Sequence, residues 1–364
     1  MNKFIFSKFF KNIDKILISL LLCLMLIGLI TLASASHQNV SLIGNQIINI
    51  LIGITLLILL SHINPKRFLF YAPYLYIASL ILLLLVAFFG FESHGAKRWI
   101  NIIFFNLQPS EIIKITIPLM LAWLYHRCQN NIGYKIHTIA FIILAIPCLI
   151  ILKQPDLGTA ILIGFSGWTI IFLAGLSSRI MMVTGFSFFL ALPYLWSTLH
   201  LYQQNRILSL IDPGRDPLGT GYHSIQSMIA IGSGGFLGKG WSYGGQTQLN
   251  FLPETSTDFI FSVYGEEFGL IGIITIFIIY FFILFRCVVM AQKMQNTFSR
   301  LAAASLVFTL FFSSFVNIAM VSGLLPIVGA PLPFISYGGT SMVVSLIMIG
   351  IIMSLHSHKS LIAN

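Results

Sequence analysis

The chain has 364 residues, of which 57% are hydrophobic and only 8% are charged. A soluble domain contains roughly 45–50% apolar and 25% charged residues, so this composition excludes an ordinary water-soluble protein. The formal net charge of +10 would suit a nucleic-acid-binding protein, but the basic residues are placed as a membrane topology signal instead.

The apolar residues gather into about ten runs of about 20 residues, the length with which a helix crosses a hydrocarbon core of about 30 Å. Each run therefore predicts a transmembrane helix. In chain order, the predicted spans lie near 16–36, 43–62, 68–90, 108–126, 136–152, 158–176, 180–197, 260–285, 301–322 and 334–356. We expect an all-α polytopic membrane protein that forms a single domain over residues 1–364.

The charges predict the orientation of the spans. Thirteen of the 20 Lys and Arg residues lie at the termini or in every second loop, and nine of the 10 acidic residues, all except Asp14, belong to the opposite side. The positive-inside rule then places both termini in the cytoplasm. The acidic, polar and glycine-rich segments face outward, and no nucleic-acid partner is needed to explain the net charge.

One loop is much longer than the others. Residues 198–259, between spans 7 and 8, are rich in Gly, Asp, Pro, Gln and Thr and predict a large extracytoplasmic loop. Long loops on a rigid scaffold often carry binding and catalysis. Within it, residues 232–240 superficially resemble a phosphate-binding loop, but Ser233 and Gly240 replace the required Gly and Ser or Thr. These glycines permit either tight turns and close backbone approach beside a short helix near 224–231, or direct phosphate contact.

Ionisable residues in spans are costly unless they face a partner or a cavity. Glu111 and Lys114 share one helix face, where they form either a self-neutralising pair that stabilises the bundle or a substrate-gripping group. Glu266 and Glu267 open the eighth span, and we expect one of them to face water or a cavity. The proline-rich residues 324–333 cannot continue a helix, so we expect them to be buried in protein or to line a cavity.

Several segments together resemble the SEDS family of shape, elongation, division and sporulation proteins. They are GAKRW at 95–99, QPSE at 108–111, QPDLGTA at 154–160, DPLG at 216–219, GYHSIQS at 221–227, GSGG at 232–235, FLPE at 251–254, TDFIF at 257–261 and PLPFISYGG at 331–339. Residues 321–331 are more similar to the RodA (elongation) branch than to the FtsW (division) branch. Two departures are Asn106, where relatives often have arginine, and residues 255–256, where many have arginine and histidine.

This resemblance implies a ten-span peptidoglycan glycosyltransferase. Its reaction polymerises lipid II into β-1,4-linked glycan strands and releases undecaprenyl pyrophosphate, for cell elongation and rod shape. The resemblance implies that Asp258 is catalytic and that Trp99, Glu111 and Lys114 are needed for activity. Arg98 and Lys239 are further candidates for binding the substrate, because cations must balance the leaving pyrophosphate. The sequence assigns no metal ligand. A divalent cation that helps to balance the pyrophosphate is an open alternative.

The chemistry needs one base. The donor sugar of lipid II is α-linked and the product is β-linked, so a single displacement inverts the anomeric carbon while a carboxylate takes the proton of the acceptor hydroxyl. Asp258 lies at the mouth of the eighth span beside apolar Phe259 and Ile260, where partial desolvation would increase its basicity. The competing interpretation of Asp258 is a helix N-cap.

The resemblance also implies partners and a location. The partners are lipid II and the nascent glycan, a class B penicillin-binding protein, other elongation-complex membrane proteins and membrane lipids. The location is the bacterial inner membrane, with the active site on the periplasmic side. Two other functions remain open, a lipid II flippase and a noncatalytic scaffold for the penicillin-binding protein. Transporters often carry internal repeats, and none is visible in the sequence.

Overall fold

The computed structural model describes residues 12–93, 96–102, 105–154, 156–198, 201–211, 220–249, 251–252 and 254–357. Its long helices are α2 (Lys15–Ala35), α3 (Val40–Ser61), α4 (Pro65–Phe89), α5 (Pro109–Arg127), α6 (Tyr134–Lys153), α7 (Leu157–Leu173), α8 (Ser178–Thr198), α12 (Ile260–Gln292), α13 (Thr297–Val321) and α14 (Gly339–Ser357). Each coincides with one predicted span. In the described part of the chain, seven helices are long and apolar enough to cross a membrane, so a multi-span membrane protein is confirmed and the count of ten stays a prediction.

Asparagine side chains set the start of several helices. The side-chain oxygen of Asn39 accepts hydrogen bonds from the backbone of Ser41 and Leu42 at the start of α3. Asn64 caps α4 in the same way, and Pro65 follows it at the first helical position. These caps satisfy backbone N–H groups that the first turn of a helix leaves unpaired. The short connections between these helices therefore have defined ends.

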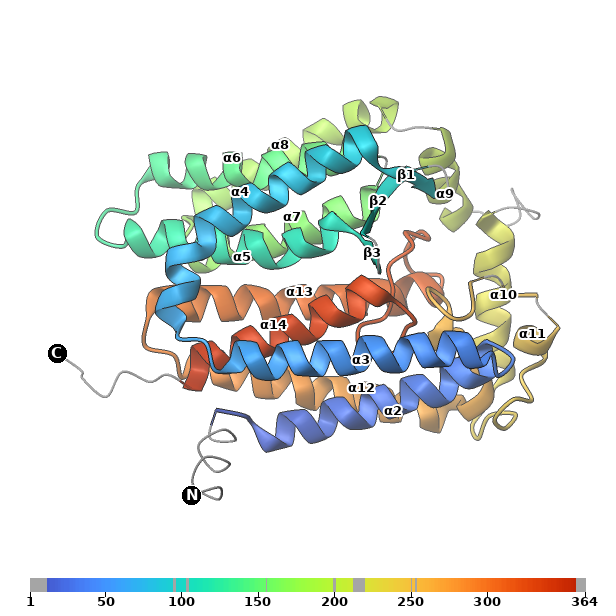
Figure 1. Cartoon of the computed structure of the whole chain (residues 1–364). Coiled ribbons are helices and arrows are strands. Elements are labelled where there is room, and N and C mark those ends of the chain that lie inside the picture. The colour runs from blue at the N-terminus through green and yellow to red at the C-terminus, as the bar shows by residue number, and fades with distance from the viewer. Residues whose placement is uncertain are drawn as a thin grey trace, which may run out of the picture.

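The helices form a bundle with α13 and α14 in its middle (Figure 1). The helix α14 packs against α3, α13 packs against α5 and α7, and α12 packs against α2 and α13. The central helices α13 and α14 bury most of their residues, whereas α3, α4 and α6 expose many apolar side chains. Exposed apolar faces on outer helices are what a lipid environment requires.

The two ends of the bundle differ. The start of α2 and the end of α14 lie at one end, and the shorter helices of the long loop lie at the other (Figure 1). These shorter helices are α9 (Leu201–Ile211), α10 (Thr220–Ser233) and α11 (Gly245–Gln248). The helix predicted near 224–231 is therefore confirmed as part of α10. The predicted loop residues Asp212, Arg215 and Asp216 lie outside the described residues.

A small sheet, which the sequence analysis did not predict, precedes α5. Its strands β1 (Phe91–Ser93), β2 (Ala96–Ile102) and β3 (Phe105–Leu107) pair antiparallel in that order. Trp99 pairs with Phe91, and Ile100 pairs with Leu107. Strands of three residues are too short to show a convincing alternation of polar and apolar residues. The sheet lies at the same end of the bundle as α9 (Figure 1).

The helix α12 is broken near its start. Gly269 has φ 64° and ψ −160°, so the helical hydrogen bonds around it are lost. The glycine-rich run 232–240 replaces them: Lys239 N donates to Glu266 O, Gly240 N donates to Glu267 O, each at 3.0 Å, and Leu270 N donates to Gly235 O at 2.9 Å. The loop therefore completes the backbone pairing of a membrane helix.

The glycines are required by this close approach. A Cβ atom on Gly238 would lie 2.0 Å from Glu267 O, and one on Gly234 would lie 2.1 Å from Gly265 O. Gly238 also has a positive φ of 80°, which favours glycine. Close backbone approach by residues 232–240 is thus confirmed.

We expect Gly238→Ala to lower the melting temperature of the purified protein in detergent. The added methyl group would overlap the Glu267 carbonyl and destabilise the fold by roughly 1–3 kcal/mol. Gly232→Ala is the matched control, because a Cβ atom there meets nothing within 4 Å and alanine favours the helix. Equal melting temperatures for the two variants would contradict this account of the glycine-rich run.

Candidate active site

Asp258 lies in a turn directly before α12. The N-cap of this helix is Phe259, which makes no side-chain cap hydrogen bond, so Asp258 precedes the cap position. The Asp258 side chain is half-buried. Its Oδ2 atom lies against Gly329 of the proline-rich segment, where an added Cβ atom would be 3.3 Å away. The carboxylate therefore faces the backbone of a non-helical segment.

The segment 322–338 holds this turn from one side. The backbone N of Tyr337 donates to Ser256 O at 2.9 Å. The hydroxyl of Ser336 donates to Thr257 O at 2.6 Å and accepts from Leu332 N at 2.8 Å. Leu332 and Ser336 are each 1% exposed. The prediction that residues 324–333 are buried in protein holds for Ile327, Ala330, Leu332 and Pro333, whereas Leu324 and Gly329 are exposed; the segment supports the turn that carries Asp258.

A buried ion pair lies close to the same segment. Lys114 Nζ is 2.6 Å from Glu111 Oε1, and both residues, on α5, are buried. They line a small pocket together with Leu310, Ser313, Pro331, Pro333, Ser341, Ser345 and Met348. Glu111 and Lys114 therefore do pair, and they do so at the wall of a pocket, which suits both of the roles predicted for them.

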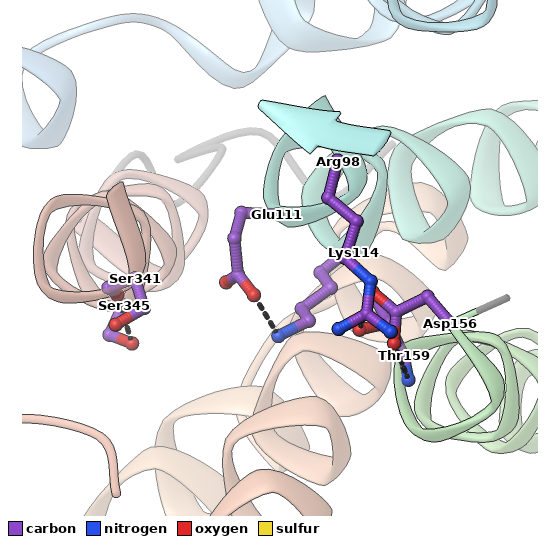
Figure 2. A network of polar contacts seen from close by, with 7 residues as sticks. All are labelled: Arg98, Glu111, Lys114, Asp156, Thr159, Ser341 and Ser345. Atoms are coloured by element: carbon purple, nitrogen blue, oxygen red, sulfur yellow. Dashed lines mark hydrogen bonds and ion pairs between the residues drawn. The ribbon is translucent and has the colours of Figure 1, made fainter. Parts of the chain in front are cut away.

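Arg98 extends from β2 toward a second carboxylate. Its Nε atom is 3.6 Å from Asp156 Oδ2, and Asp156 also caps α7 by accepting hydrogen bonds from the backbone and hydroxyl of Thr159. Figure 2 shows Arg98 of β2 reaching toward Asp156 at the start of α7, with the Glu111–Lys114 pair of α5 beside them and Ser341 and Ser345 of α14 farther away. The sequence analysis gave no role to Asp156, although an aspartate before an apolar run is a recognisable helix-start signal.

The pocket and Asp258 share one stretch of backbone. Gly329 touches the Asp258 carboxylate, and Pro331, two residues later, lines the pocket with Glu111 and Lys114. The Asp258 carboxylate and a pocket that contains Lys114 thus both lie against residues 329–331. Such an arrangement can deprotonate one group while it stabilises negative charge on another.

Lys239 belongs to a different cluster. Its Nζ atom is 2.7 Å from Glu266 Oε1, and Glu266 also accepts from Gln246 N at 3.0 Å. Glu267 accepts hydrogen bonds from the Ser34 hydroxyl and from Ser242 N. Glu266 and Glu267 are 0% and 1% exposed, so neither carboxylate faces water, and the alternative that one of them faces a cavity stays a prediction. They attach the loop to α12 and α2.

Trp99 is half-buried on β2. Phe91 pairs with Trp99 and Glu92 pairs with Lys97, so the register shifts here and Arg98 is the extra residue of a bulge, which interrupts the regular alternation of side chains. In the part of the chain that the structure describes, no three His, Cys, Asp or Glu side chains gather as metal ligands.

Comparisons with known proteins agree with this architecture. The sequence profile of the FtsW, RodA and SpoVE cell cycle proteins matches residues 14–361. The peptidoglycan glycosyltransferase MrdB of Escherichia coli K12 is 43% identical over 353 residues, which cover 97% of this chain and 95% of MrdB. A probable peptidoglycan glycosyltransferase FtsW of Geobacter metallireducens is 36% identical over 94% of each chain.

Two solved structures share the fold. One, described as "Structural coordination of polymerization and crosslinking by a peptidoglycan synthase complex", has a TM-score of 0.82 and 31% identity, and covers 95% of this chain and 99% of its own. The other is the Rod shape determining protein RodA of Thermus thermophilus, with a TM-score of 0.72 and 26% identity over 95% of this chain and 98% of its own.

The polytopic helical fold and the profile match define the class: this chain belongs to the FtsW, RodA and SpoVE family of membrane proteins. Within that family it belongs to the RodA branch, since it is 43% identical to MrdB along almost the whole chain.

We expect Glu111→Gln and Lys114→Met each to lower the melting temperature strongly. Removing one partner of a buried pair leaves an uncompensated charge, which costs about 3–5 kcal/mol. The double variant Glu111→Gln/Lys114→Met should recover most of that loss, because both charges are then absent. Thermal unfolding of the four proteins measures this coupling, and strictly additive losses would show that the pair does not stabilise the bundle.

Proposed function

We propose that this chain is a peptidoglycan glycosyltransferase that polymerises lipid II into β-1,4-linked glycan strands for cell elongation and rod shape. The observation that carries the proposal is the position of the Asp258 carboxylate. It lies against Gly329, two residues before Pro331, which lines the pocket of Glu111 and Lys114. The names of the relatives MrdB and FtsW support the activity.

In this proposal Asp258 is the base. It removes the proton of the acceptor sugar's 4-hydroxyl while that oxygen attacks the anomeric carbon of the donor. The bond to the pyrophosphate breaks on the opposite face, so the configuration inverts in one step. The turn that carries Asp258 is held by Ser336 and Tyr337, and a fixed carboxylate lowers the entropic part of the barrier.

The departing pyrophosphate is balanced by Lys114 and Arg98. The carboxylates of Glu111 and Asp156 hold these cations in place. A lysine ammonium has three donors and an arginine guanidinium has five, so each can bind phosphate oxygens without leaving its carboxylate. Pairing with these carboxylates lowers the free-energy cost of keeping the two cations near the membrane before the substrate binds.

We assign Lys239 and Trp99 to substrate binding outside this network. The Lys239 side chain is 35% exposed beside Glu266, so its remaining donors can reach a phosphate or a glycan. Trp99, at the sheet, offers an aromatic face at the same end of the bundle.

We propose that residues 198–259 form the extracytoplasmic loop of one domain spanning 1–364 and that Asp258 faces the periplasm. The positions of the basic residues support cytoplasmic termini. The start of α2 and the end of α14 lie at the end of the bundle opposite to the loop (Figure 1), which agrees with an even number of spans in the inner membrane.

We propose a class B penicillin-binding protein and other elongation-complex membrane proteins as partners. The similar structure with a TM-score of 0.82 is described as part of a peptidoglycan synthase complex that coordinates polymerisation and crosslinking. A flippase would move lipid II without forming bonds, and a scaffold would act without any substrate. Both alternatives predict that loss of the Asp258 carboxylate leaves glycan synthesis unchanged.

We expect Asp258→Asn to abolish glycan synthesis by the purified protein from labelled lipid II, by at least about 100-fold, because an amide cannot act as the base. Glycan products on a gel measure this. Asp14→Asn is the matched control: it removes a carboxylate that pairs with Arg286 at the other end of the bundle, and it should retain polymerisation. Equal product from wild type and Asp258→Asn would remove Asp258 as the base.

We expect a membrane-impermeant maleimide to label Tyr243→Cys in intact spheroplasts of a strain that carries an otherwise cysteine-free protein. Tyr243 is 78% exposed in the loop. The control Asn131→Cys, exposed between α5 and α6, should react only after permeabilisation. The reverse pattern would place the loop in the cytoplasm and contradict the proposed reaction.

A further inference from the structure

One buried amide connects the two halves of the candidate site. Asn317 lies on the central helix α13 and is 0% exposed. Its Nδ2 atom donates to the backbone oxygen of Asp258 at 2.9 Å and to the backbone oxygen of Ala330 at 2.6 Å. These two carbonyls belong to the turn that carries the base and to the proline-rich segment.

The chemistry of the amide fixes its orientation. Both partners are carbonyl oxygens, which only accept hydrogen bonds, so only the NH₂ group can bind both of them. An asparagine amide has two N–H donors, and Asn317 uses one for each carbonyl. A serine or threonine at this position has a single donor and could bind only one.

The other end of the amide gives an independent indication. Asn317 Oδ1 is buried and has no hydrogen-bond partner among the described residues. A buried acceptor without a partner is destabilising, and an apolar side chain of similar size would avoid that cost. Asparagine is therefore a poor choice for packing alone, and the two donated hydrogen bonds explain its presence.

The two carbonyls that Asn317 binds lie next to the residues that form the candidate site. Ala330 lies between Gly329, which touches the Asp258 carboxylate, and Pro331, which lines the pocket. Fixing Ala330 and Asp258 on one amide therefore fixes the carboxylate relative to the pocket that contains Lys114. A mismatch of about 1 Å between reacting groups can cost on the order of 100-fold in rate.

The helix α13 is a suitable reference for this connection. It packs against α5, α7, α12 and α14. Leu310 and Ser313 line the pocket, and Asn317 follows Ser313 by four residues, so the three side chains share one helix face. One face of the packed helix α13 thus contacts both the pocket and the turn that carries Asp258.

We infer that Asn317 is a positioning residue for glycosyl transfer, which holds the Asp258 turn and the proline-rich segment at a fixed separation. The inference depends on the proposed function, because its effect is on the geometry of the base. Asn317 contacts the backbone rather than the reacting atoms, so it acts on the turnover number and leaves substrate binding intact.

The test is steady-state polymerisation of lipid II by the purified full-length protein, with kcat and KM measured separately for three variants. Asn317→Ser keeps one donor, Asn317→Ala keeps none, and Asn317→Asp places a carboxylate against two carbonyl oxygens. We expect kcat to fall progressively in this order, by about 10-fold to 100-fold for Asn317→Ala, while KM stays within about 2-fold of wild type. Each rate is divided by the folded fraction, measured by size-exclusion chromatography.

Thr309→Val is the matched control. Thr309 is buried on the same helix and bonds to Ser166 and Ser305, away from the proline-rich segment. Its loss should lower the melting temperature and leave kcat unchanged. Should Asn317→Ala fail to fold, Asn317→Ser with its single donor carries the comparison.

Two results would overturn the inference. One is a kcat within about 2-fold of wild type for both Asn317→Ala and Asn317→Asp, since misplacement of the base is expected to lower kcat by about 10-fold or more. The other is a loss of kcat in Thr309→Val that matches the loss in Asn317→Ala, which would make Asn317 merely structural. Failure of the proposed function has a different signature, in which wild type and Asp258→Asn yield equal glycan.

Discussion

The structure depends on one constraint: at membrane depth, each backbone polar group and each charge needs a partner within the protein. This chain has two non-helical interruptions at such positions, the break in α12 at Gly269 and the proline-rich segment 322–338. The glycine-rich run 232–240 pairs with the first, and the side chains of Ser336 and Asn317 pair with the second. Three cations are likewise matched with carboxylates, as Lys114–Glu111, Arg98–Asp156 and Lys239–Glu266.

The same pairing prepares the site for chemistry. An unpaired lysine in a bundle would be neutral or would distort its surroundings, whereas a lysine held by a carboxylate stays charged and keeps donors for an anion. The proline-rich segment has no helical hydrogen bonds of its own to satisfy, so Ala330 O can accept from Asn317 of α13, while Tyr337 N and the Ser336 hydroxyl donate to carbonyls of the Asp258 turn. Because the helices are interrupted here, the Asp258 carboxylate and the pocket that contains Lys114 both come to lie against residues 329–331.

The sequence predicted what depends on local composition and missed what depends on distant contacts. The spans follow from apolar runs, and each run coincides with a helix. This holds even for α5, whose apolar run contains the charged residues Glu111 and Lys114, and for α7, which is only 17 residues long. The pairing of Glu111 with Lys114 follows from helical spacing. The bond between Asn317 and Asp258 joins residues 59 apart, and no periodicity reveals it. The sequence did not predict that residues 239–248 cover Glu266 and Glu267 and keep both from water, because nothing in the composition of this loop indicates where it packs.

The break at Gly269 divides α12 into two helical pieces with different contacts. Residues 260–268 follow the turn of Asp258 and are bonded through Glu266 and Glu267 to the outer loop, whereas the remainder, from Leu270 on, is packed along the bundle as a continuous rod. Glycine adopts a positive φ without steric penalty, so it can join the two pieces at this angle. The loop residues 239–248 and the turn that carries Asp258 are thus attached to the same short helical piece, about two helical turns long.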